Sequence, residues 1–178
     1  ASRPAARAFL LASESNARSA RLEAIPDAPE GLRAAHAQLV STQYEEFRAK
    51  LAAFDAEAAK RQAELQSTKE LVAKLEQTLP LAARRAADFK RLVEQRYISE
   101  HGYLEREQVR IEQERDLAFQ RSRARELALA VQEAKERRAA FVAEARRVQA
   151  DVLAAAAKRI AALEQEVVKT GQRERLMQ

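Results

Sequence analysis

The stretch FKRLVEQRYISEHGYLE, residues 89–105, decides how this chain folds. Long segments with a helical pattern of apolar residues run into it from both sides, and the two patterns mirror each other about it. Three of the four Pro residues and all three Gly residues lie at or near the expected helix ends, where they cost least. We therefore expect this stretch to form the tip of a long antiparallel helical hairpin.

The composition favours long helices over a compact domain. Charged residues make up 33% and aromatic residues 5% of the chain, so there is too little bulky apolar material for a deep core. The longest apolar runs are far shorter than the roughly 20 residues of a transmembrane helix. No signal peptide is visible at the start, so we expect either a cytosolic protein or an excised piece of something larger.

The charges are interleaved along the chain and are not gathered in blocks. There are 32 basic and 27 acidic residues, which give a net charge of +5. A nucleic-acid-binding protein more often concentrates Lys and Arg on one face, with aromatic residues among them. A solvated helix surface is therefore the simpler interpretation. The absence of Cys excludes disulfides and thiolate metal sites.

The positions of the Gly and Pro residues predict three helices. In chain order, the expected elements are a short helix at about 4–25, a linker at 26–30, a long helix at about 31–95, the tip at 96–99 and a second long helix at about 100–171. The first helix has a ragged apolar stripe, so we expect it to pack at the base of the hairpin, on the start of the second helix and the end of the third. Pro80 removes a backbone hydrogen bond to the carbonyl of Glu76 and predicts a bend there.

Capping residues support these boundaries. Ser2 is placed to cap the first helix. Asp27 and Glu30 are spaced as a capping box for the second helix, and Gly171 is placed to end the third.

Each long helix carries a seam of residues spaced alternately three and four apart, as in a coiled coil. The seam of the second helix comprises Ala37, Val40, Tyr44, Phe47, Leu51, Phe54, Ala58, Arg61, Leu65, Thr68, Val72, Leu75, Leu79, Ala82, Ala86, Phe89 and Val93. The seam of the third comprises Leu117, Gln120, Ala124, Leu127, Val131, Ala134, Arg138, Phe141, Ala145, Val148 and Val152. Beyond Val152 the stripe shifts by one position, to Leu153, Ala156, Ile160, Leu163 and Val167, which indicates a change of packing partner.

A single register pairs the two seams. Opposed residues of an antiparallel pair have numbers with a nearly constant sum, and here that sum is about 195 or 196. The expected pairs are Phe47 with Val148, Phe54 with Phe141, Leu65 with Val131, Thr68 with Leu127, Val72 with Ala124, Leu79 with Leu117, Leu92 with Leu104 and Val93 with Tyr103. The two seam arginines, Arg61 and Arg138, each fall opposite an alanine. The sequence therefore predicts an all-α fold: an antiparallel hairpin of two long helices with a short third helix at its base.

The residue patterns of enzymes are missing from the sequence. His36 and His101 lack the spacing of metal ligands and are most simply solvated side chains. Acidic neighbours such as Glu45 and Glu46 could be drawn as catalytic pairs, but a two-helix hairpin offers no water-excluded cleft to shift their pKa values. We therefore expect no enzymatic activity, no metal and no cofactor.

The tip has more apolar and basic residues than a turn needs. Its candidate functional residues are Arg91, Leu92, Arg96, Tyr97, Ile98 and Ser99. Ser99 also suits the N-cap of the third helix. Tyr97 and Ile98 are either exposed for a partner or held by local capping contacts, and the pattern alone leaves both open.

The region Leu79–Ala118 carries a family resemblance. It reads LPLAARRAADFKRLVEQRYISEHGYLEREQVRIEQERDLA and is similar to the hairpin of the HlyD-type periplasmic adaptors, or membrane fusion proteins. That family has an LP step, a KRL segment, a [YF][IV]S turn and a YLE-x-EQ helix start in this order. The close match covers about 40 residues, and the flanking coiled coil suits the family over the entire chain.

The resemblance implies an adaptor of a type I secretion system. Such adaptors are anchored in the inner membrane of Gram-negative bacteria and cross the periplasm between an ABC transporter and a TolC-like outer-membrane channel. Several copies, commonly six, pack their hairpins side by side, and the tips dock on the channel while a protein cargo such as a toxin is exported. Lipoyl, β-barrel and membrane-anchor parts normally flank the hairpin and are not expected in this chain.

Related adaptors dock through an Arg, a Leu four residues later and a Ser or Thr seven after that. The resemblance carries the last two positions over to Leu92 and Ser99. Asp88 occupies the Arg position, so either Arg84, Arg85 or Arg91 replaces it or this branch docks differently. Gly102 stands where the family has an acidic residue, which leaves the capping box of the third helix incomplete.

Two other interpretations stay open. The chain resembles hairpins of multidrug-efflux adaptors in the same family, although those are often shorter. A cytosolic coiled-coil scaffold or nucleic-acid-binding arm is the alternative from another class, and a steep salt dependence of DNA affinity would support it.

Overall fold

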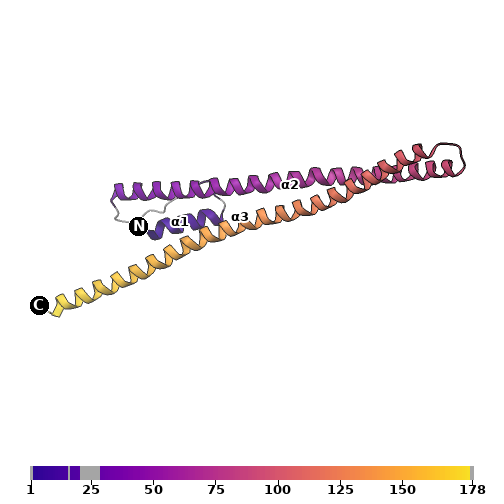
Figure 1. The fold of residues 1–178 in the computed structure, drawn as a ribbon. Coiled ribbons are helices and arrows are strands. Elements are labelled where there is room, and N and C mark those ends of the chain that lie inside the picture. The colour runs from indigo at the N-terminus through magenta and orange to yellow at the C-terminus, as the bar shows by residue number, and fades with distance from the viewer. Residues whose placement is uncertain (1, 16, 21–28, 177–178) are drawn as a thin grey trace. The chain divides into compact units, whose positions relative to one another are not determined.

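The computed structural model describes residues 2–15, 17–20 and 29–176. In that part of the chain it contains three helices and no strand. The helices, labelled in Figure 1, are α1 (Ser2–Glu14), α2 (Glu30–Glu94) and α3 (Glu100–Leu176). α2 and α3 pack closely against each other. The predicted fold, a hairpin of two long helices with a short third helix, is therefore confirmed.

Both ends of α2 and the start of α3 lie within one residue of the predicted positions. The carbonyl of Pro29 accepts hydrogen bonds from the N–H groups of Leu32 and Arg33, both at 3.0 Å, which opens α2. The expected cap Asp27 lies outside the described residues. α2 continues through Pro80 without interruption, and the bend at that residue stays a prediction.

Two helix ends differ from the sequence-based expectation. α1 ends at Glu14, well before residue 25, and residues 17–20 are not helical. α3 continues through Gly171 to Leu176, so Gly171 does not end it. Both predictions relied on sparse signals: a ragged stripe for α1 and a lone Gly for α3. Helical Gly costs only about 1 kcal/mol relative to Ala, which a long helix can absorb.

The structure divides into two units. The base unit comprises Ala1–Phe54 with Arg137–Gln178, and the tip unit comprises Asp55–Glu136. Each unit contains parts of both α2 and α3. None of the helices in the described part of the chain has an apolar stretch able to cross a lipid bilayer.

The predicted seam residues of the tip unit are all buried or half-buried. Leu65, Leu127 and Val131 form a core cluster against which Ala124 packs. Ala82, Ala86, Leu117 and Ala134 are also buried. At the edge of this seam, Arg121 Nη2 lies 2.6 Å from Glu76 Oε1 and joins α3 to α2.

Aromatic rings form the core of the base unit. The rings of Phe54 and Phe141 lie 5.3 Å apart, so their predicted pairing is confirmed. Phe47 stacks on Phe141 at 5.4 Å, and Phe9 of α1 packs edge-on against Phe47 at 5.3 Å and Tyr44 at 5.5 Å. α1 thus joins the same core as α2 and α3.

Side chains of the long helices donate hydrogen bonds to carbonyls at the end of α1 and in the residues that follow it. Tyr44 Oη lies 2.9 Å from the carbonyl of Ala12 and 2.8 Å from that of Ala17, and it can donate its one proton to either. Arg146 Nη2 donates to the carbonyl of Ser13 at 3.0 Å, and Arg48 donates to that of Arg18 at 3.1 Å. Burial raises the pKa of the Tyr44 phenol, so this donor stays protonated.

The position of α1 corrects one expectation. We expected α1 to cover the end of α3 and so to explain the shifted stripe beyond Val152. Instead, α1 belongs to a cluster whose α3 members are Phe141, Val142 and Ala145. The shifted stripe is largely exposed, with 54% of Leu163 accessible to solvent. Val148, the predicted partner of Phe47, is 44% exposed.

Candidate functional site

The turn at the tip begins with a left-handed residue. Arg96 has a φ of 63°, the one positive φ among the described non-Gly residues. The N–H of Tyr97 donates to the carbonyl of Leu92 at 2.9 Å, and the N–H of Arg96 donates to that of Val93 at 2.8 Å. These two bonds, together with the left-handed conformation of Arg96, form a Schellman motif, which satisfies carbonyls of the last turn of α2.

Ser99 opens α3 at the other side of the turn. Its carbonyl accepts a hydrogen bond from the N–H of Gly102 at 3.2 Å, and α3 begins at the next residue, Glu100. This is the N-cap position that the sequence predicted. Among the described residues, the Ser99 hydroxyl has no hydrogen-bond partner. A Cβ on Gly102 would lie 3.9 Å from the Phe89 ring, an ordinary contact, so space does not demand glycine there.

The candidate tip residues are mostly exposed. Tyr97 is 75% exposed, the largest value among the exposed large apolar and aromatic side chains of the described residues. Arg91, Leu92, Arg96 and Ser99 are exposed, whereas Ile98 is half-buried. The structure therefore separates the two residues that the sequence left open together: Tyr97 is exposed to solvent and Ile98 is half-buried.

A shallow groove lies on the last turns of α2. Asp88, Arg91, Leu92 and Gln95 line it. Arg91 Nη2 forms an ion pair with Asp88 Oδ1, and both side chains are well exposed. An exposed pair of this kind adds little to stability. Its effect is to place a guanidinium directly beside Asp88 on the surface.

Near the tip, one pair of residues that the sequence predicted to pack together is exposed. Leu104 was expected to pack against Leu92, yet both are exposed. His101 Nε2 lies 3.4 Å from Glu105 Oε1 on the outer surface of α3, in agreement with a solvated histidine. The heptad pattern could not predict the exposure of Leu92 and Leu104, because side chains so close to the turn have few neighbours to cover them.

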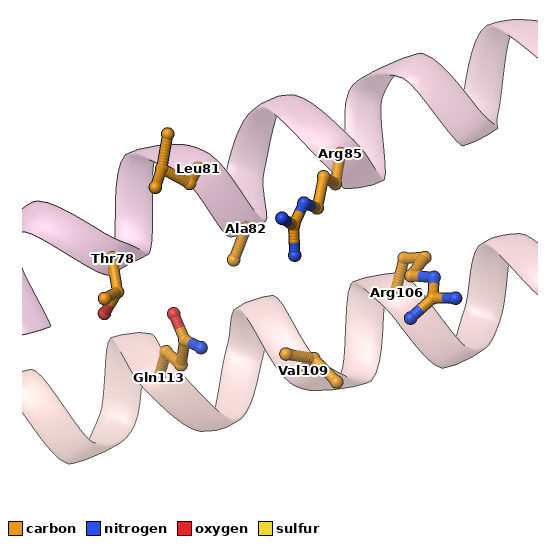
Figure 2. Close-up of a pocket in the computed structure, with 7 residues that line it drawn as sticks. All are labelled: Thr78, Leu81, Ala82, Arg85, Arg106, Val109 and Gln113. Atoms are coloured by element: carbon orange, nitrogen blue, oxygen red, sulfur yellow. The ribbon is translucent and has the colours of Figure 1, made fainter.

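A second groove lies between α2 and α3 within the tip unit, as Figure 2 shows. Its lining comprises Thr78, Leu81, Ala82, Arg85, Arg106, Val109 and Gln113. The buried oxygen Oε1 of Gln113 has no hydrogen-bond partner. The guanidinium carbon of Arg106 lies 5.3 Å from the centre of the Phe89 ring, a cation–π contact. The small side chain of Ala82 leaves this layer incompletely filled.

Surface ion pairs involve several titratable groups of α3. Arg110 donates to Glu107 at 2.6 and 3.0 Å and to Glu114 at 2.8 Å. The hydrogen bonds from Arg110 lower the pKa of Glu107, so this carboxylate stays charged. The described residues contain no group of three His, Cys, Asp or Glu side chains that could hold a metal ion.

Comparison with known proteins identifies the family. A family model described as CyaD, alpha-helical hairpin domain, matches residues 2–177. No curated protein matches the chain. The family match includes all three helices and the tip, which is far more than the 40 residues around the turn that carry the sequence motifs. The chain therefore belongs to the family of CyaD alpha-helical hairpin domains.

Proposed function

We propose that this chain is the hairpin of an HlyD-type periplasmic adaptor in a type I protein secretion system. The membership in the CyaD hairpin family supports the assignment over residues 2–177. The order of the tip motifs, from the LP step at Leu79 to the helix start at Tyr103, supports the HlyD-type branch. The proposed role is structural and involves no enzymatic step, metal or cofactor.

The proposed partners follow from this role. The tip docks on a TolC-like outer-membrane channel, and the parts that flank the hairpin in the whole adaptor connect it to an inner-membrane ABC transporter. The hairpin works in the periplasm, as one of six copies around a path for a secreted protein. Nucleic acid has no part in it, since acidic residues accompany the basic ones along both long helices.

The exposure of the Tyr97 side chain is the observation on which the docking role depends. A turn between two helices does not need a large aromatic side chain, and 75% of this one is exposed. Tyr and Arg are among the residue types enriched in interface hot spots, and Arg96 directly precedes Tyr97 in the chain. Leu92 and Arg91 lie on the last turns of α2, five and six residues before Tyr97 in the chain.

Arg91 is the residue that we propose in place of the missing docking arginine. It forms an ion pair with Asp88, the residue that occupies the arginine position of related adaptors. Arg85 is a poorer candidate because it lines the groove between α2 and α3, farther from the turn. Asp88 then serves to orient Arg91 toward a partner.

Substitutions at the tip test this proposal. In the complete adaptor, Leu92→Asp and Ser99→Arg should each abolish export of the protein cargo, because they place a charge in the docking contact. Binding of the adaptor to the channel should weaken on the order of thirtyfold or more, the effect of losing one hot-spot contact. Helicity should stay unchanged because both positions are exposed, and Ser99→Arg should lower stability by no more than the roughly 1 kcal/mol of a lost N-cap.

Leu71→Asp provides the matched control. Leu71 is also an exposed leucine of α2 but lies several turns from the tip, so this variant should export normally. Normal export by Leu92→Asp and Ser99→Arg would contradict the docking role. Equal loss of export in all three variants would show that added charge, and not the tip, is responsible.

A further inference from the structure

An exposed apolar face follows α3 through the base unit. It consists of Val148, Val152, Ile160 and Leu163, all of which are exposed. The first turns of α2 in the same unit also carry exposed leucines, Leu32 and Leu39. Isolated apolar residues on a surface are ordinary, but two exposed apolar stripes on two helices of one unit call for a partner.

The register of the hairpin indicates that each stripe is the partner of the other. The nearly constant sum that aligns Phe54 with Phe141 applies equally to these stripes. It places Val148 opposite Phe47, Val152 opposite Tyr44, Ile160 opposite Ala35, and Leu163 opposite Leu32. The stripe of α3 shifts by one position beyond Val152, and Leu32 and Leu39 are shifted by one from the seam of α2 as well. The two shifted stripes therefore match each other.

α1 occupies the surface of α2 that this pairing would use. Phe9 packs edge-on against both Tyr44 and Phe47, the assigned partners of Val152 and Val148. Arg146 of α3 and Tyr44 of α2 both donate hydrogen bonds to carbonyls at the end of α1. In Figure 1, α1 lies between the two long helices of the base unit.

We propose that α1 is a removable spacer and that the base unit has a second, closed state. In the closed state α1 leaves, and residues 30–47 of α2 pack against residues 148–163 of α3 in the register of the rest of the hairpin. This inference rests on contacts within one chain and does not depend on the proposed role in secretion.

The two states exchange similar interactions, which is the requirement for a two-state element. Closing buries the apolar stripes of α2 and α3 and exposes Phe9, Ala8 and Ala12, which are buried in the structure. It also releases the carbonyls that Tyr44, Arg48 and Arg146 hold. α1 has 13 residues, so it is marginal as an isolated helix and should unfold on release. A single anchor residue such as Phe9 can therefore decide which of the two states of the base unit is populated.

Distance measurements between spin labels test the proposal. The chain has no Cys, so Ala34→Cys with Ala161→Cys gives one labelled pair that leaves Leu32 and Leu163 intact. In the otherwise unchanged chain this pair should give a long distance. With Phe9→Glu added, a short distance should appear, equal to that of a reference pair at Ala52→Cys and Ala143→Cys.

Three controls make the result decisive. Leu11→Glu adds the same charge on the exposed side of α1 and should leave the 34–161 distance long. Adding Leu163→Glu to Phe9→Glu should remove the short distance, whereas adding Gln165→Glu should not. A 34–161 distance that stays long after Phe9→Glu, with the 52–143 distance unchanged, would overturn the proposal. Broadening of both distances would overturn it too, because the closed state requires α2 and α3 to hold together without α1.

Discussion

At the scale of single residues, Arg96 adopts the backbone conformation that helix ends usually assign to glycine. An L-residue with a side chain pays on the order of 1 kcal/mol for a left-handed conformation. Strained residues of this kind cluster at functional sites. Arg96 stands directly beside the exposed Tyr97, so the left-handed residue lies within the turn that we propose as the docking site.

Replacement of this residue gives a prediction with a definite sign. Arg96→Gly should raise the free energy of unfolding of the tip by about 1 kcal/mol because glycine removes the left-handed strain. Chemical denaturation and amide hydrogen exchange of the last turn of α2 would measure the gain. Arg84→Gly, in the interior of the same helix, should instead cost about 1 kcal/mol. A loss of stability in both variants would contradict our description of the turn.

At the scale of helices, stability depends on a narrow seam. Leu127 is 3% exposed and belongs to the cluster with Leu65 and Val131, whereas Leu129 on the same helix is 72% exposed. Two leucines within one turn of each other thus differ completely in burial. The difference follows from the heptad spacing, which directs Leu127 toward α2 and Leu129 toward solvent.

These two leucines form a matched pair of variants. Leu127→Ala should lower the free energy of unfolding by about 2–5 kcal/mol because it removes buried apolar atoms and leaves a cavity. Leu129→Ala should change it by less than about 0.5 kcal/mol, as is usual for surface positions. Urea denaturation followed by circular dichroism would compare them. Similar losses for both would mean that the seam lies elsewhere on α3.

The helices were predictable from the sequence where their pattern is long and regular. The alternation of three and four along α2 and α3 predicted the burial of Leu65 and Leu127 and the pairing of Phe54 with Phe141. The end of α1 and its place on Tyr44 were not predictable, because a short stripe does not specify which surface it covers. At the tip, Ser99 was recognisable as an N-cap, but nothing in the sequence marks Arg96 as left-handed.

At the scale of the whole molecule, one register governs both units. The residue numbers of Phe54 and Phe141 in the base unit and of Leu65 and Val131 in the tip unit have nearly the same sum, 195 or 196. A hairpin of this kind has no independent means of correcting a slip, because each layer of the seam depends on the alignment of the next. Changes in the length of one long helix therefore have to be matched in the other.

A pair of deletions tests this dependence. Removal of residues 66–72 from α2 together with residues 124–130 from α3 takes one heptad from each helix at the same level. The doubly shortened chain should remain fully helical with a single unfolding transition. Removal of residues 66–72 alone should lower the melting temperature and expose either the turn or the base contacts, and circular dichroism with limited proteolysis would detect this. Equal melting of the two variants would argue against a single register.

The shared register has a consequence for how such a protein can change in evolution. Its reach can grow or shrink only by paired insertions or losses of seven residues, each worth about 10 Å of coiled coil. The residues around Tyr97 would remain at the end of the hairpin, unchanged, when its length changes. Related hairpins of different length should therefore differ in whole steps of this size and keep the same turn.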